Sequence, residues 1–161
     1  MRRLGYLGEF FKCAAHQPRA LAAFIDFTEA SQDGLSQSLA EVVALTCTSW
    51  MGNCYEQNQH ERLSLRLGFG RDWVAAVEAL QPDKHSILTS EEQAVQRLTL
   101  AALETREKTS GELFEKTVQS MGSQLAMAIL MLTGRYVVHG LIANTLELKP
   151  PVPSIFEDVS E

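Results

Sequence analysis

The chain has 161 residues and a mass of 17.9 kDa, within the usual size range of one folded domain. Apolar residues make up 45% and charged residues 21% of it, which is ordinary globular usage and excludes an intrinsically disordered chain. The formal net charge is -6, and the basic residues are scattered along the chain and not gathered into a stripe. Nucleic acid is therefore excluded as a partner, because phosphate binding needs a concentrated basic surface.

The sequence predicts a cytoplasmic protein. Arg2 and Arg3 open the chain, but Glu9 and Lys12 interrupt any apolar run that could serve as an export signal. The three cysteines are an odd number with no closely spaced pair, a usage that fits a reducing compartment.

No membrane association is expected either. The most apolar stretch runs from 125 to 143, yet it contains Arg135 and His139 together with Thr133 and two glycines. Charged residues are rare in membrane spans, so a buried core helix is the better interpretation.

Helix signals begin in the first third of the chain. Pro18 suits the first turn of a helix over 18–28, which the Asp33-Gly34 pair ends. Ser38 with Glu41 three residues later forms a capping-box pattern that predicts a helix from about 38 to 50.

Asn53 can cap the following helix, which Gly68 ends, and 71–80 reads as another short helix. Thr89 with Glu92 and Thr109 with Glu112 are further capping boxes, which predict helices over about 90–105 and 110–120.

The last predicted helix follows Gly122 and runs to about 148, either straight or bent around Thr133 and Gly134. Pro150, Pro151 and Pro153 then exclude helix. No strand alternation persists and no repeat is visible, so the sequence predicts an all-α bundle. We expect one domain over 1–161, with a core at about 10–150 and an extended tail over 150–161.

The candidate catalytic side chains are concentrated between residues 53 and 60. Asn53, Glu56 and His60 are three and four residues apart, so a helix places them within an arc of roughly 60°. Glu41, on the preceding helix, can pack toward that face. A first-turn carboxylate can orient and charge a histidine one turn later, which suits proton transfer and predicts a Glu56–His60 pair. Asn53 and Glu56 could equally be only a helix cap with its reciprocal partner.

The segment Glu41-Val-Val-Ala-Leu, then Asn53-Cys-Tyr-Glu56 and His60, resembles the signature of the carboxymuconolactone decarboxylase and alkylhydroperoxidase D (AhpD) family. In the peroxidase branch that signature is a glutamate, then C-x-x-C with a histidine four residues after the second cysteine. Asn53 and Glu56 stand in the places of the two cysteines, while Glu41 and His60 match the relay glutamate and histidine. Tyr55 before Glu56 is typical of the decarboxylase-like branch.

This resemblance implies an AhpD-like helical bundle and a cofactor-free reaction on a small carboxylated or lactone substrate. It implies Glu56, His60 and Glu41 as catalytic residues. The expected substrate-binding residues are Asn53, Tyr55 and, three apart on the last helix, Tyr136 and His139. Tyr136 and His139 could equally be an ordinary tyrosine and histidine of the core. Gln57 stands where that branch often has tryptophan.

Three alternatives stay open. The first is a thiol antioxidant enzyme in which Cys54 replaces the missing cysteine pair, although peroxide reduction needs an attacking and a resolving thiol. The second is a non-catalytic binding protein on the same fold. The third is a metal site of Glu41, Glu56 and His60, whereas the decarboxylase-like interpretation needs no metal.

Self-association is also expected. The 127–132 run is more apolar than one face of a surface helix requires. The resemblance implies a trimer or a hexamer.

Overall fold

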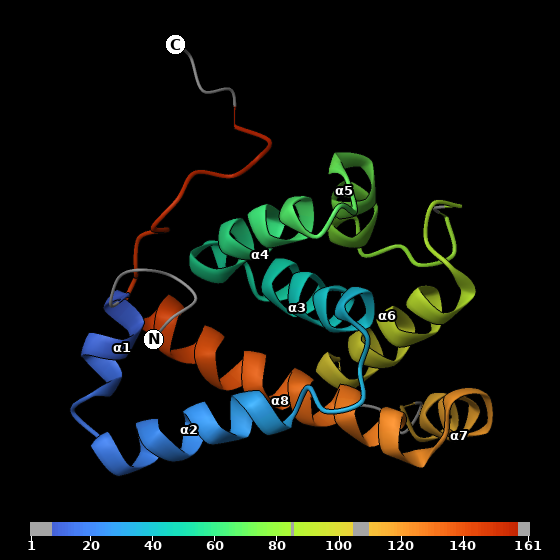
Figure 1. Ribbon diagram of the computed structural model, residues 1–161, viewed down its shortest axis with the longest axis horizontal. Helices are drawn as coiled ribbons and strands as arrows, with labels where there is room; N and C mark the ends of the chain where they lie inside the picture. Colours follow the sequence, from blue (N-terminus) through green and yellow to red (C-terminus); the bar gives the residue numbers. More distant parts are fainter. Residues whose placement is uncertain (1–7, 85, 105–109, 158–161) are drawn as a thin grey trace.

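The computed structural model describes residues 8–84, 86–104 and 110–157 of the chain. Helices and their connections make up this part of the protein, which contains no strand. Figure 1 shows the arrangement of its helices, which are α1 (Glu9–Ala14), α2 (Pro18–Ala30), α3 (Gln37–Met51), α4 (Cys54–Arg66), α5 (Arg71–Glu78), α6 (Ser90–Leu103), α7 (Ser110–Met121) and α8 (Ser123–Thr145).

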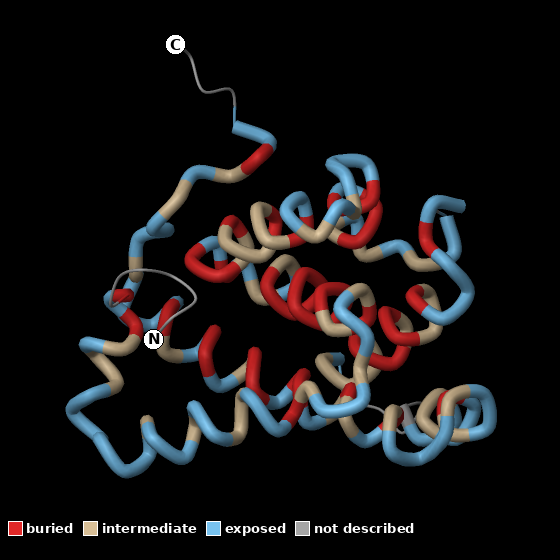
Figure 2. The backbone as a smooth tube through the Cα atoms, in the orientation of Figure 1, coloured by how far each residue is buried: buried red, intermediate tan, exposed pale blue. Residues whose placement is uncertain are grey.

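Helix α3 forms the centre of the bundle. It is buried at every position from 41 to 48 and packs against α4, α5, α6 and α8 (Figure 2). Its apolar side chains join those of α5, α6 and α8 in one core that includes Val42, Leu45, Val74, Leu98 and Ile129. Burying a side chain of this size contributes about 1.5–3 kcal/mol to folding.

The connection between α3 and α4 is short because Gly52 adopts a left-handed conformation at φ 61°. The end of α3 passes close to α8. A Cβ atom on Gly140 of α8 would lie 2.7 Å from the Cε atom of Met51, the last residue of α3. The turn and this close approach place the start of α4 directly beside α8.

Several predicted helix boundaries are confirmed. Thr89 and Glu92 form a capping box in which each side chain accepts a hydrogen bond from the other residue's backbone. Asn53 caps α4, Gly68 follows its end, and the chain after Leu148 is not helical. The predicted Thr109–Glu112 box begins at Thr109, which lies outside the described residues.

The capping box expected at Ser38 and Glu41 is wrong. Ser36 is the N-cap of α3, and its side chain accepts from the backbone N–H of Leu39. Glu41 lies five positions into the helix, too far to reach the cap, and it faces α4 instead. The last helix is a single continuous α8, in which the Thr133 hydroxyl donates to the carbonyl of Ile129.

The tail after α8 is held against α4. Asn58 and Arg62 donate to the carbonyls of Val152 and Pro153, and the buried carboxylate of Glu61 accepts from Ser154 and from the backbone of Ile155. The Ile155 side chain enters the main core.

Helix α8 is long and apolar enough to cross a membrane, a criterion that the core helix of a soluble protein also meets. One of its faces packs against α3, α6 and α7 and buries Arg135, Tyr136 and His139. The expectation of a core helix agrees with this packing.

Candidate functional site

Helices α3, α4 and α8 bring together a chain of three polar side chains. The Nδ1 atom of His60 lies 2.9 Å from Oε2 of Glu41, and its Nε2 atom lies 3.1 Å from the hydroxyl oxygen of Tyr136. Ser64, one turn after His60, donates to the same Oε2 atom at 3.2 Å. In the neutral tautomer that donates from Nδ1 to Glu41, Nε2 accepts the proton of the Tyr136 hydroxyl.

The electrostatics of this chain favour a charged imidazole. Burial lowers the pKa of His60, but the Glu41 carboxylate and its hydrogen bond outweigh burial, so the pKa is raised above its ordinary value. Burial raises the pKa of the Tyr136 hydroxyl well above its ordinary value, against the opposing effect of Arg135. Tyr136 therefore stays a neutral hydroxyl, which donates to Nε2 of neutral His60 and accepts from Nε2 when the ring is protonated. His60 is a group that gains and loses a proton.

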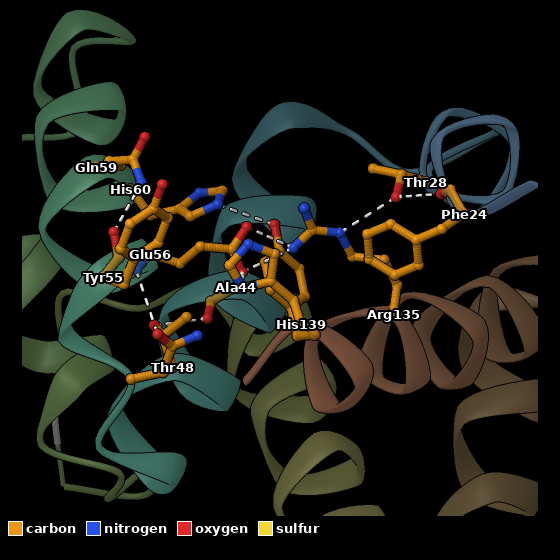
Figure 3. Close-up of polar contacts among 12 residues, drawn as sticks. Phe24, Thr28, Ala44, Thr48, Tyr55, Glu56, Gln59, His60, Arg135 and His139 are labelled. Carbon is orange, nitrogen blue, oxygen red and sulfur yellow. Dashed lines mark hydrogen bonds and ion pairs between the residues drawn. The ribbon is translucent and has the colours of Figure 1, made fainter. Parts of the chain in front are cut away.

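A second cluster lies beside the first and joins α4 to α8. Both carboxylate oxygens of Glu56 accept from one guanidinium nitrogen of Arg135, at 2.7 and 2.8 Å. Arg135 also lies over the ring of Tyr136, 4.4 Å from its centroid, and donates to the hydroxyl of Thr28 at 3.4 Å. Figure 3 shows Glu56 and His60 extending from α4 toward Arg135 and His139.

His139 completes this cluster on the side of α1. Its Nδ1 atom lies 3.1 Å from Oε2 of Glu56 but without the alignment of a hydrogen bond, and its ring stacks on Phe10 with centroids 3.8 Å apart. Burial lowers the pKa of His139 to about 4, although Glu56 opposes the shift. His139 is therefore a neutral ring near neutral pH.

The charges of Glu56 and Arg135 stabilise each other. Burial raises the pKa of Glu56, but Arg135 and the two histidines outweigh it, so the pKa is lowered. Burial likewise lowers the pKa of Arg135, and Glu56 more than compensates. The pair is fully ionised at the centre of the protein.

The direct pair predicted between Glu56 and His60 is replaced by two others. Glu56 binds Arg135, whereas His60 binds Glu41. The reason is the position of α8, whose guanidinium is a stronger and always charged partner for a buried carboxylate. Glu41 is thus the immediate partner of His60 and not an assisting group.

The residues expected to bind substrate are placed around these clusters, and a substrate role for them stays a prediction. Asn53 is buried at the N-cap of α4, where its side chain accepts from the backbone N–H of Glu56 at 3.4 Å. The Tyr55 hydroxyl accepts from the backbone N–H of Phe10. Tyr136 contacts His60, and His139 contacts Glu56.

The reciprocal cap considered for this helix start is only half formed. Glu56 does not fold back, because its carboxylate is held by Arg135 and the backbone N–H of Asn53 donates to the carbonyl of Thr48. The Nδ2 atom of Asn53 has no hydrogen-bond partner among the described residues.

Cys13, Cys47 and Cys54 are free cysteines. Cys47 is buried beside the site, and burial strongly raises the pKa of its thiol. Cys54 is exposed and Cys13 is partly buried. Peroxide reduction by a thiol enzyme needs an attacking and a resolving thiol, so an antioxidant role for Cys54 stays a prediction.

The described residues include no group of three or more His, Cys, Asp and Glu side chains arranged to hold a metal ion. Glu41, Glu56 and His60 do not converge on one point, since Arg135 occupies the carboxylate of Glu56.

Sequence reasoning missed three contributors to the site: Arg135, Phe10 and Ser64. Arg135 had a signal, because a charged residue inside an otherwise apolar helix requires a buried partner. Phe10 lies on the short helix α1, which was not predicted. Ser64 follows His60 by one turn, but nothing in its sequence context distinguishes it from a core serine.

Comparisons with known proteins support the fold. No family model matches the sequence, and no curated protein matches it. A solved structure from Agrobacterium tumefaciens, a protein of unknown function proposed to be an antioxidant defence protein AhpD, is similar with a TM-score of 0.78 at 18% identity. The alignment covers 87% of this chain and 96% of that one.

A second similar structure comes from Ralstonia eutropha and is an uncharacterized peroxidase-related protein with an alkylhydroperoxidase AhpD core. Its TM-score is 0.73 at 19% identity, over 92% of this chain and 79% of that one. Both likenesses extend over most of the helical bundle. The chain therefore has an AhpD-like, all-α fold, as its sequence predicted.

Proposed function

We propose that the protein is a cofactor-free enzyme that transfers protons on a small carboxylated or lactone substrate. The observation that carries this proposal is the hydrogen-bonded chain Glu41–His60–Tyr136. A carboxylate that holds a histidine, whose other nitrogen faces a hydroxyl, is the arrangement of a general acid–base catalyst.

Each member of the chain has a distinct role. Glu41 fixes the ring of His60 and stabilises its protonated form. His60 accepts the substrate proton and returns it at the product stage, so the reaction needs no external oxidant or reductant. The His60 side chain keeps 15% of its surface exposed, whereas Tyr136 is buried, so the substrate meets His60. Nε2 of His60 then exchanges its contact with the Tyr136 hydroxyl for the substrate proton, while Nδ1 stays on Glu41.

Arg135 and Glu56 support the proposal in another way. Arg135 lies over the Tyr136 ring and thereby fixes the hydroxyl that faces His60. Glu56 neutralises the guanidinium and so prevents it from lowering the proton affinity of His60 further. Glu56, which stands in the place of the second cysteine of the peroxidase-branch signature, is thus one half of an ion pair.

Deuterium exchange tests the proposal before the substrate is known. Small carboxylic acids and lactones are incubated with the protein in D₂O, and NMR records deuterium incorporation beside the carbonyl group. We expect incorporation with the wild type and a loss of about two orders of magnitude in His60→Gln. Tyr136→Phe should slow exchange less, and Ile87→Lys, a change on an exposed loop residue, should not slow it.

Equal exchange in the wild type and in His60→Gln would contradict the proposal. If no compound of either class exchanges while one of them binds, the fold serves as a binding protein.

A thiol antioxidant function is the second candidate, favoured by the antioxidant and peroxidase-related descriptions of the two similar structures. It is tested by thiol-dependent consumption of hydrogen peroxide and an alkyl hydroperoxide. We expect consumption at the background rate, equal in Cys54→Ser and the wild type. A rate that Cys54→Ser abolishes would favour the antioxidant function instead.

A further inference from the structure

Helix α8 presents an uncharged face to solvent on the side opposite the candidate site. Between Met127 and Leu141 its exposed positions are four apolar residues and one glycine. The exposed fractions are 50% for Met127, 46% for Met131, 45% for Val138 and 58% for Leu141, with Gly134 between them. Figure 2 shows the buried and exposed turns alternating along this helix.

These five positions form one continuous stripe, hereafter the α8 stripe. Their spacing is four, three, four and three residues, so at 100° per residue they fall within an arc of about 80°. A spacing of this kind is typical of a helix that packs along its length against another helix. The contact would be about 21 Å long.

Gly134 is unexplained by the fold of one chain. A glycine inside a helix costs about 1 kcal/mol relative to alanine. A Cβ atom at this position would meet no atom within 4 Å, so no internal contact requires its absence. A glycine at the centre of an exposed apolar stripe does allow a second helix backbone to approach closely.

The stripe is nearly symmetrical about Gly134. Met127 and Leu141 lie seven residues before and after it, and Met131 and Val138 lie three before and four after. Two copies of α8 that cross antiparallel at Gly134 would therefore place Met127 of one against Leu141 of the other. A two-fold axis makes the same surface self-complementary in this way.

Charge also favours a second copy as the occupant. Each chain carries a net charge of -6, so two copies repel over most of their surfaces. The only charged residue within α8 is Arg135, which is buried against Glu56. The α8 stripe is thus a face on which two acidic chains can meet without opposing like charges, whereas net negative charge disfavours an anionic membrane surface.

We propose that two copies of this protein associate through the α8 stripe, antiparallel, with the two-fold axis at Gly134. An isologous contact produces an even number of chains, which is compatible with a dimer or with a hexamer but not with an isolated trimer. The association would also fix the helix that carries Tyr136 and Arg135.

Light scattering coupled to gel filtration tests the contact. We expect the wild type at an even multiple of the 17.9 kDa chain mass and both Met131→Lys and Val138→Lys at half the wild-type mass. Circular dichroism should show unchanged helix content, since both side chains are exposed. Ile87→Lys is the matched control, an equally exposed apolar residue on a loop, and should keep the wild-type mass.

Disulfide trapping tests the arrangement, in a background of Cys13→Ser and Cys54→Ser. Gly134→Cys should form a cross-linked dimer on oxidation, as should the double variant Met127→Cys/Leu141→Cys. Val138→Cys should not, because its two copies would lie about 12 Å apart along the helices.

Several outcomes would overturn the proposal. They are a monomeric or trimeric wild type, an assembly that keeps its mass in both lysine variants, equal trapping of Val138→Cys and Gly134→Cys, and binding of the wild type to neutral phosphatidylcholine vesicles in place of self-association.

Discussion

Glu41 and His60 are 19 residues apart in the sequence and belong to adjacent helices, yet their side chains are joined by a 2.9 Å hydrogen bond inside the bundle. The protonation of His60 controls the chemistry proposed here, and the Glu41 carboxylate raises the pKa of that imidazole. A substitution at Glu41 can therefore change the protonation of His60 while the imidazole itself is kept.

Replacing Glu41 by glutamine should lower the pKa of His60. Burial already lowers that pKa, and the carboxylate that compensates is lost in Glu41→Gln. NMR titration of the imidazole carbon-bound protons measures the change. Ser64→Ala is the control, because Ser64 donates to the same carboxylate oxygen but carries no charge. An unchanged titration in Glu41→Gln would show that the carboxylate does not set the charge of His60.

Breaking the Glu56–Arg135 pair on one side should destabilise the protein strongly. Glu56→Gln or Arg135→Met each leaves a buried charge without its partner, which costs about 3–5 kcal/mol. The double variant removes both charges and should cost less than the sum of the single variants. Urea unfolding of the four proteins measures this coupling, and strictly additive effects would argue against a direct interaction.

Acid should unfold the protein partly through His139. Its pKa is depressed to about 4 in the folded state, so the unfolded chain binds the proton more readily. Stability is therefore lost as the pH falls from about 6.5 through 4, by up to about 3 kcal/mol. His139→Phe retains a ring against Phe10 and should show a shallower loss over that window. Chemical unfolding at several pH values measures the free energy of unfolding of the wild type and of His139→Phe. An equal loss of stability with falling pH in the two proteins would refute the prediction.

Glu78 should change the stability with pH in the opposite sense to His139. Its pKa is raised to about 7, chiefly by burial; the hydrogen bond from Gln57 opposes the rise and the nearby Glu61 adds to it. The folded state then holds a proton that the unfolded state releases near 4.5, so stability declines as the pH rises from about 4.5 through 7.

The isosteric change Glu78→Gln should remove this decline and add about 1–3 kcal/mol of stability at pH 8. Glu112→Gln changes a fully exposed carboxylate on α7 and should leave the pH dependence between 5 and 8 as in the wild type. A Glu78→Gln protein no more stable than wild type at pH 8 would disprove the assignment.

The sequence by itself determined the helical class, most of the helix boundaries and the segment that carries the chemistry. Helix boundaries were readable at Pro18, Thr89 and Gly122 because a cap or a proline acts within a few residues of its position. The spacing of Glu56 and His60 likewise placed both side chains on one face of α4, since helical geometry is local.

Only the tertiary structure decided which side chains bind each other. Glu56 and His60 are local neighbours, but each prefers a partner supplied by another helix, because burial makes an ionised partner worth far more than sequence proximity. Arg135 is 79 residues from Glu56 in the sequence, and no local sequence pattern predicts that the two side chains meet. The contacts of Phe10 depend in the same way on the path of α1 across the end of α8, which packing against the bundle determines.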